Sequence, residues 1–263
     1  MTSIEAVGAP RTRLHDMVFP DQTNHHGTLF GGAALAMLDK LAFIVASRCL
    51  RRSLVTASVS RLDFLSPVHA GDLAEASALV AARGHRSIEI EAELFGENLH
   101  TGTRVCCLSG RFVMVASGEV PLGPVDEADH LAQDAETRTV RVAELVLPNQ
   151  TNHRGILHGA AALAWLSKAA LVAASRATRR TLIMASSDRL DFLAPARSGD
   201  IVETRARVVS TGRSSVRVDA AMDAECPLTG ERRLCTRAGF VFVAIDADGR
   251  PTPIHTHTTH APD

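Results

Sequence analysis

The chain has 263 residues, of which 46% are hydrophobic and 22% charged, and its formal net charge is −1. This composition is typical of a globular protein with room for two domains of ordinary size. The balanced charge gives no reason to expect nucleic acid as a partner, and no segment is apolar for long enough to span a membrane. The N-terminus does not read as a secretory signal. Five cysteines without metal-ligand spacing favour a reduced, cytoplasmic setting and no bound metal.

The chain contains an internal repeat. When the sequence is shifted by 128 residues, PDQTNHHGTLFGGAALAMLDK from Pro20 aligns with PNQTNHRGILHGAAALAWLSK from Pro148. Between 20–72 and 148–200, 31 of 53 positions are identical, and the match continues without a gap. A duplicated domain is therefore predicted. The expected division is a first domain over 12–117, a linker over 118–139, a second domain over 140–247 and a flexible tail over 248–263.

Both repeats have the same predicted elements in chain order. In the first, a short strand at 14–18 leads through a polar loop into a helix at 31–48. Four strand-like runs follow, separated by Pro and Gly turn residues, at 54–66, 72–82, 87–94 and 103–115. The second repeat has the corresponding strand at 140–145 and helix at 159–176. One helix with a long antiparallel sheet indicates an α+β domain.

The predicted helix at 31–48 is apolar on almost every side. Within AALAMLDKLAFIVA only Asp39 and Lys40 carry charges. A helix of this kind must be enclosed, and a sheet that curls around it would enclose it. A buried carboxylate is costly unless it is partnered or used in chemistry, so Asp39 is the first functional candidate. The alternative is a solvated helix charge beside Lys40.

The segment PDQTNHHGTLFGGAALAMLDK, followed by VTASVSRLDFLSPVHAGD and GHRSIEIEAEL, resembles the acyl-CoA hydrolase family. The family pattern runs Pro, Asn, Gly, then Gly-Gly, then Asp, and the resemblance covers nearly the whole chain. It implies two tandem hotdog domains, each a curved antiparallel sheet wrapped around one central helix. It also implies hydrolysis of fatty acyl-CoA at the interface of the two domains, with no cofactor beyond the CoA of the substrate. A homo-oligomer is expected, with a trimer of double-hotdog chains favoured.

Thioester hydrolysis needs an activated water and donors for the developing oxyanion. A helix N-terminus supplies such donors, and Asp39 can deprotonate the water. Asp39 lies about 11 Å along the axis from Gly32, at ~1.5 Å per residue, too far to serve its own helix N-terminus. If the two helices lie antiparallel, Asp39 meets the other N-terminus, as the resemblance also implies. The predicted catalytic pair is Asp39 and Asn152. Further substrate contacts are expected from residues around this pair: Gly159, Ala160, His158 and Thr56.

The second composite site is predicted to be degenerate. It would combine Asn24, Gly31 and Gly32 with Ser167, which stands where the first repeat has Asp39. A hydroxyl cannot replace a carboxylate as a base without a helper. Lys168 is adjacent, but neighbouring helix residues do not face each other, which disfavours a Ser167 nucleophile.

Two loops, GHRS at 84–87 and GRSS at 212–215, lie where the resemblance places contacts to the CoA nucleotide. Arg86, Ser87, Arg213 and Ser215 have the donors that phosphate groups need, although ordinary hairpin turns explain the same residues. Contacts to the acyl chain are expected from large apolar residues of the helices: Met37, Leu38, Phe43 and Trp165.

The favoured function is that of an acyl-CoA thioesterase. The alternative is a non-catalytic acyl-CoA binding or sensor module, which the Asp39 retained in the helix disfavours. Another hotdog reaction, such as dehydration, would need a His and a carboxylate at other positions, and no such pair stands in matching context.

Overall fold

The computed structural model describes residues 11–116 and 139–254. The predicted linker at 118–139 lies almost wholly outside the described residues, as does the predicted tail beyond residue 254. Each repeat contributes one long helix, α1 (Gly31–Leu50) or α2 (Gly159–Thr178). A short 3-10 turn precedes each helix, η1 (Pro20–Gln22) or η3 (Pro148–Gln150).

Strands occupy most of the remaining chain. Those of the first repeat are β1 (Thr12–Met17), β2 (Leu54–Val59), β3 (Leu62–Phe64), β4 (Leu73–Arg83), β5 (Ser87–Glu97) and β6 (Arg104–Ala116). Those of the second repeat are β7 (Val140–Leu145), β8 (Leu182–Ser187), β9 (Leu190–Phe192), β10 (Ile201–Thr211), β11 (Ser215–Glu225) and β12 (Arg232–Ala244).

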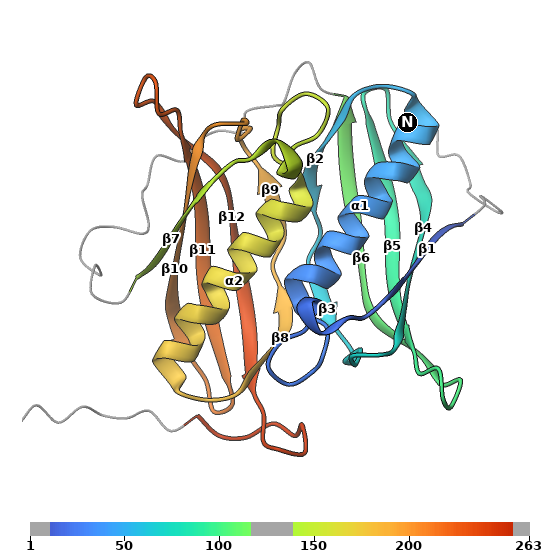
Figure 1. Ribbon diagram of the computed structural model, residues 1–263, viewed down its shortest axis with the longest axis vertical. Helices are drawn as coiled ribbons and strands as arrows, with labels where there is room; N and C mark the ends of the chain where they lie inside the picture. Colours follow the sequence, from blue (N-terminus) through green and yellow to red (C-terminus); the bar gives the residue numbers. More distant parts are fainter. Residues whose placement is uncertain (1–10, 117–138, 255–263) are drawn as a thin grey trace, which may run out of the picture.

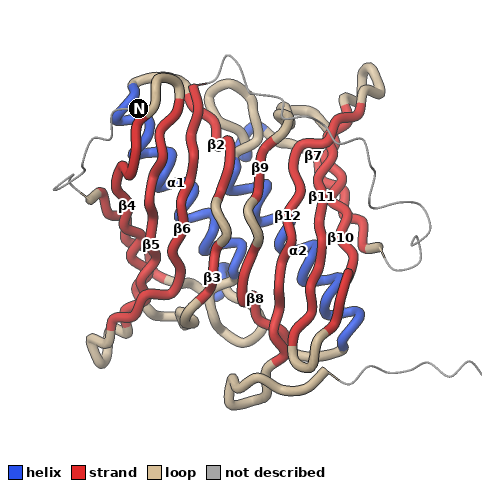
Figure 2. The backbone as a smooth tube through the Cα atoms, turned by 180° about the vertical axis from the view of Figure 1, so that it is seen from behind, coloured by secondary structure: helices blue, strands red, loops and turns tan. Residues whose placement is uncertain are grey.

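The twelve strands form one antiparallel sheet in the order β1-β4-β5-β6-β2-β9-β12-β11-β10-β7. The short strands β3 and β8 also lie between β6 and β12, where β3 pairs with β6 and β8, and β8 pairs with β3 and β12. Figure 1 shows α1 and α2 side by side on one face of this sheet, running in opposite directions. Figure 2 shows the other face, where the strands are in front of both helices. The two repeats therefore share one continuous sheet and one helical layer.

The repeats join through the middle strands. The predicted single strand at 54–66 is wrong, since β2 and β3 are separated at Ser60, whose backbone N–H donates to the Arg111 carbonyl at 2.8 Å. This break lets β2 pair with β9 and β3 with β8 of the other repeat. Ser58 pairs with Asp191 and Asp63 with Ser186, which are equivalent pairs under the 128-residue shift. The join is therefore pseudo-symmetric.

Each helix is covered on two sides. In α1 the side chains of Leu35, Leu38 and Leu41 are buried completely or nearly so, and the helix contacts both the sheet, mainly β4 and β5, and α2. A third side faces outward, where Lys40 and its counterpart Lys168 are exposed. The nearly all-apolar helix composition thus follows from contact with both a sheet and a second helix.

Backbone hydrogen bonds from Thr252 and Ile254 anchor the stretch 248–254 to the second domain, so the predicted flexible tail does not begin at residue 248. The Ile254 side chain is buried, and its backbone N–H donates to the Arg213 carbonyl at 2.7 Å. Burial of this apolar side chain holds the stretch in place. None of the described helices is long and apolar enough to cross a membrane.

Candidate active site

Asp39 is a buried carboxylate in the middle of α1, with 4% of its surface exposed. Its Oδ1 accepts a hydrogen bond from the Thr56 hydroxyl at 2.7 Å, and the backbone N–H of Ala160 donates a second bond to its side chain. Burial disfavours the charged form more strongly than these bonds favour it, and raises the pKa of Asp39 from 3.8 to about 6. Asp39 is thus ionised at neutral pH, yet accepts a proton more readily than an exposed carboxylate.

The bond from Ala160 joins the two repeats. Because α1 and α2 are antiparallel and in contact, the middle of α1 lies beside the N-terminus of α2. A methyl group on Gly159 would lie 3.0 Å from both carboxylate oxygens of Asp39 and 3.0 Å from the Thr56 hydroxyl. The structure therefore brings Asp39 to Gly159 and Ala160 across the domain interface, as the sequence predicted. Their catalytic and binding roles stay predictions.

The two loop asparagines differ in their hydrogen bonds. Asn152 Oδ1 accepts from the backbone N–H groups of Arg154 at 2.9 Å and Ile156 at 3.2 Å. In the first repeat the Asn24 side-chain amide, Nδ2, also donates to the Thr28 hydroxyl at 2.9 Å. Ile156 stands where Thr28 does and lacks a hydroxyl. In the described chain the Asn152 amide thus has no acceptor, and it is available to a ligand.

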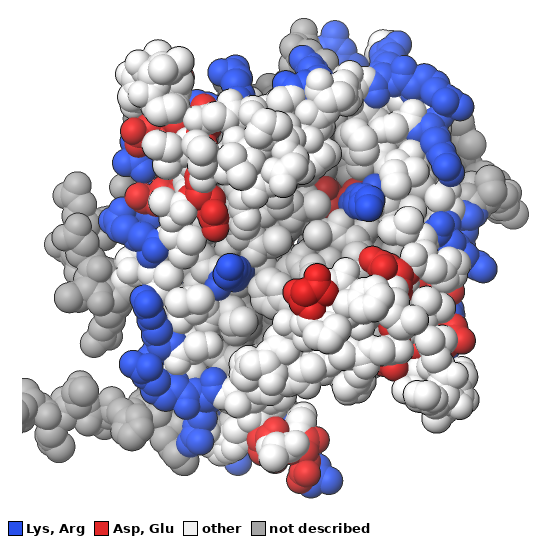
Figure 3. Space-filling view, in the orientation of Figure 1, with Lys and Arg blue, Asp and Glu red and all other residues white. Residues whose placement is uncertain are grey.

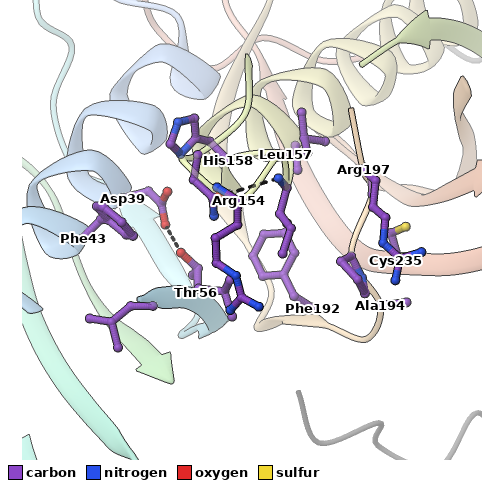
Figure 4. A pocket seen from close by; sticks show the side chains of 18 of the residues that line it. Asp39, Phe43, Thr56, Arg154, Leu157, His158, Phe192, Ala194, Arg197 and Cys235 are labelled. Atoms are coloured by element: carbon purple, nitrogen blue, oxygen red, sulfur yellow. Dashed lines mark hydrogen bonds between the residues drawn. The ribbon is translucent and has the colours of Figure 1, made fainter. Parts of the chain in front are cut away.

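A cavity of about 380 Å³ opens beside Asp39, and Figure 4 shows side chains around it. Its walls come from α1 and β2 of the first repeat and, in the second repeat, from α2, β9, β11, β12 and the loops that precede α2 and follow β9. Five of the predicted site residues line it together: Asp39, Thr56, Asn152, His158 and Gly159. Ala160 does not line the cavity and contributes through its backbone N–H. The predicted acyl contact Phe43 also lines it, whereas Met37, Leu38 and Trp165 do not.

The sequence did not point to several other residues of this cavity, namely Arg197, Phe192, Met222 and Cys235. Arg154 and Arg197 are charged and exposed, and each replaces a histidine of the first repeat, so the 128-residue comparison carried a signal for both. Burial raises the pKa of the Cys235 thiol to about 12, so this thiol is protonated at neutral pH and is no nucleophile.

His158 is the residue before the first turn of α2. Its ring lies edge-on to Phe43, with 6.4 Å between the ring centroids. Burial lowers the pKa of His158, so its ring is neutral at pH 7. A neutral imidazole supplies no positive charge to Asp39, which is consistent with the raised pKa of that carboxyl.

A second cavity lies at the equivalent place, where the N-terminus of α1 meets the second repeat, and it is smaller, about 120 Å³. Asn24 and Gly31 line it, but Gly32 and Ser167 do not, and none of its described lining residues carries a carboxylate. The Ser167 hydroxyl donates to the Ala164 carbonyl of its own helix at 3.0 Å. Met184 replaces Thr56, and its sulfur would lie 3.0 Å from a methyl group on Gly31. Met184 therefore narrows this cavity, and no carboxylate base stands among its described lining residues.

The difference between Gly32 and Ala160 also has a structural cause. A methyl group on Gly32 would collide with the Ser167 hydroxyl and with the Phe30 ring. The glycine at this position therefore permits close helix packing at the second cavity. At the Asp39 site the equivalent residue is Ala160, whose backbone N–H bonds to Asp39.

The predicted nucleotide contacts lie outside both cavities. Ser87 pairs with Val115 of β6, and Val115 pairs with Val55 of β2, which lines the Asp39 cavity. Ser87 and Arg86 therefore lie two strands away from Val55, roughly 10 Å at the usual strand spacing.

The loop of the second repeat lies by the other cavity. Ser215 pairs with Val243, which pairs with Ile183 of the smaller cavity. The structure thus does not bring Arg213 and Ser215 to Asp39. The loop at 84–87 therefore lies nearer to the Asp39 cavity and the loop at 212–215 nearer to the smaller cavity. The sequence prediction had assigned both loops to one substrate site.

Gly159→Ala is expected to reduce turnover of a thioester substrate by at least tenfold. The added methyl group must displace Asp39 or Thr56, because all three oxygens lie at 3.0 Å from its position. The measurement is kcat of Gly159→Ala, compared with kcat of Gly31→Ala, which is the equivalent change at the smaller cavity. Equal kcat values for the two variants would contradict a special role for the space beside Gly159.

The Thioesterase superfamily pattern matches residues 26–103 and 154–229, one match in each repeat and together more than half of the chain. The chain belongs to the Thioesterase superfamily. Its two domains are hotdog folds, each with one helix against the shared antiparallel sheet. Each repeat matches the family pattern separately, so both domains belong to this superfamily.

Named relatives agree with this assignment. The chain is 24% identical to the cytosolic acyl coenzyme A thioester hydrolase of Rattus norvegicus, in a match that covers 89% of this chain and 74% of that protein. It is 34% identical to the uncharacterized acyl-CoA thioester hydrolase YkhA of Bacillus subtilis, over 45% of this chain and 69% of that one. A solved Lactobacillus plantarum structure, provisionally an oleoyl thioesterase, has a TM-score of 0.66 at 10% identity and covers 91% of this chain and 98% of its own. That likeness shows the fold alone.

Proposed function

We propose that this protein hydrolyses acyl-CoA thioesters to the free acid and CoA at the cavity between its two hotdog domains. The observation that carries the proposal is the contact of a buried carboxylate from one repeat with the helix N-terminus of the other. Asp39, Gly159 and the Asn152 amide border the same cavity. The names of the relatives support acyl-CoA as the substrate class.

In the proposed reaction Asp39 takes a proton from a water molecule, and the hydroxide adds to the thioester carbonyl carbon. The oxygen of the tetrahedral intermediate becomes negative. Donors for it are the Asn152 amide, which lacks another acceptor in the described residues, and the positive end of the α2 dipole. When the carbon–sulfur bond breaks, the CoA thiolate receives the proton that Asp39 held. The steps balance without a metal or a cofactor.

A thiol-release assay with acyl-CoAs of graded chain length tests this function. A steady release of CoA thiol that is absent from Asp39→Asn supports it. Tight acyl-CoA binding with no release by the native protein would instead favour the binding or sensor alternative. The smaller cavity is proposed to contribute no turnover, because it lacks a carboxylate among its described lining residues and Met184 narrows it.

The rate of hydrolysis is expected to depend on pH through Asp39. The pKa of this carboxyl is raised to about 6, so its basic form is lost as the pH falls through 6. We expect kcat/KM to rise about tenfold per pH unit below this value and to level off above pH 7. A profile measured between pH 4.5 and 8 checks this, and a half-maximal point near 4 would contradict the raised pKa.

We also propose that the chain acts in the cytoplasm as a homo-oligomer, with a trimer favoured. Phe19 and its counterpart Leu147 are exposed by 56% and 46%, so both repeats present a large apolar side chain at the same place. Light scattering gives the assembly mass, and a trimer has three times the chain mass of 28.0 kDa.

A further inference from the structure

Two arginines border the Asp39 cavity, and neither has an ion-pair partner in the part of the chain that the structure describes. Arg154 comes from the loop before α2, and Arg197 from the loop between β9 and β10. Figure 4 shows Arg154 between Asp39 and Phe192, with Arg197 farther along the same cavity. Both side chains are exposed, so their charges lie at the opening rather than beside the buried carboxylate.

The two loops are bonded to each other. Ile156 and Arg197 form an antiparallel bridge, and the Ser198 N–H donates to the Gly155 carbonyl at 2.7 Å. Arg197 therefore takes part in the backbone contact between the loops, and Arg154 is one residue from Gly155, which also takes part in it. Both cations thus come from loops that are bonded to each other and border one cavity, and two guanidinium groups so placed suit an anion with several oxygens.

The first repeat lacks this pair. His26 and His69 occupy the equivalent positions, and neither lines the smaller cavity. His69 faces Asp72, with 3.6 Å between Nδ1 and Oδ2. In the second repeat the equivalent carboxylate, Asp200, pairs with the Arg233 guanidinium, which leaves the Arg197 side chain free of it.

The carboxylate and the two unpaired cations thus belong to the same cavity, although they arise from different repeats. Arg154 is the counterpart of His26, and Asp39 is the counterpart of Ser167. The two positions at which the repeats differ in this way therefore contribute their charged residues to the same cavity. Figure 3 shows basic and acidic side chains interspersed on the helix-bearing face. Arg154 and Arg197 are the arginines among the described lining residues of the Asp39 cavity, and they offer positive charge to an anionic substrate there.

We propose that Arg154 and Arg197 bind phosphate groups of the substrate's carrier while the thioester reaches Asp39. This inference rests on the proposed function and deepens it. It assigns recognition of the carrier to these two loops rather than to the hairpin turns at 84–87 and 212–215. The ligand class is a thioester attached to a phosphorylated nucleotide, as in acyl-CoA, in preference to a thioester without phosphate.

The test compares one acyl group on two carriers, CoA and N-acetylcysteamine, which has no phosphate. For Arg154→Gln/Arg197→Gln we expect KM for the acyl-CoA to rise at least tenfold, with kcat within about twofold of the native value. The kcat/KM for the N-acetylcysteamine thioester should stay within about twofold. Arg→Lys at both positions should restore part of the acyl-CoA affinity, because the charge is kept and the planar fork lost.

The matched control is His26→Gln/His69→Gln, which changes the equivalent positions of the first repeat and should leave KM for both substrates unchanged. An equal loss with both carriers would show that the arginines support the loops only, and no loss with either would also overturn the inference. Both outcomes leave the proposed function standing if the native protein releases CoA thiol. A native protein without release would overturn the proposed function itself.

Discussion

Asp39→Asn is expected to lower kcat for acyl-CoA hydrolysis by about 10²–10⁴-fold, the usual contribution of a positioned general base. The asparagine side chain has nearly the same shape, and it can still accept from the Ala160 N–H and contact the Thr56 hydroxyl. It cannot take a proton from water. Thiol release at saturating acyl-CoA measures the loss, and the affinity of the variant for a non-hydrolysable acyl-CoA thioether should stay within about threefold.

The matched control is Ser167→Ala, which changes the equivalent residue of the other repeat and should leave kcat within about twofold. Equal damage from both variants would contradict the assignment of one working site to Asp39. A substantial residual rate in Asp39→Asn would show that another group activates the water.

The stability of Asp39→Asn distinguishes loss of chemistry from loss of fold. The pKa of Asp39 is higher in the folded chain, about 6 against 3.8, so the folded state binds the proton more tightly. The free energy of unfolding therefore falls as the pH rises from about 4 through 6. At pH 8 the ionised carboxylate costs on the order of 3 kcal/mol, from about 1.4 kcal/mol per pKa unit. Removal of this charge should make the variant more stable than the native protein at pH 8.

Asn152→Ala is expected to lower kcat by about 10²–10³-fold, the range for loss of one oxyanion donor. The Asn152 amide borders the Asp39 cavity and has no competing acceptor within the described residues. Its Oδ1 also holds the loop, so part of the loss could come from loop movement. Asn152→Asp separates the two contributions, because it keeps the acceptor oxygen and replaces the amide donor.

Asn24→Ala is the matched control for Asn152→Ala. It removes the equivalent loop bonds in the first repeat, including the bond to the Thr28 hydroxyl, and should change kcat less than about threefold. If Asn24→Ala were as damaging as Asn152→Ala, the cross-domain pairing of Asp39 with the second repeat would be wrong. If Asn152→Asp kept the native kcat, the amide would not be the donor.

The repeat made much of the fold predictable from the sequence. Both helices begin at the predicted residues, Gly31 and Gly159, and most strands fall within a few residues of their expected bounds. The break between β2 and β3 was not predictable from local pattern, because both sides of Ser60 read as strand. The break depends on pairing with β8 and β9, which lie more than 120 residues away in the chain.

Part of the candidate site was likewise predictable from the sequence, and part depends on the tertiary structure. The sequence by itself determined the duplication, the carboxylate in an apolar helix and the Asp39-to-Ser167 difference, since these are differences in residue type between aligned repeats. The tertiary structure decided what surrounds them. Antiparallel packing of α1 against α2 sets Asp39 beside Gly159, burial raises its pKa, and loop contacts bring Arg154 and Arg197 to one opening. These properties depend on distances between residues far apart in the chain, and a local sequence pattern does not encode them.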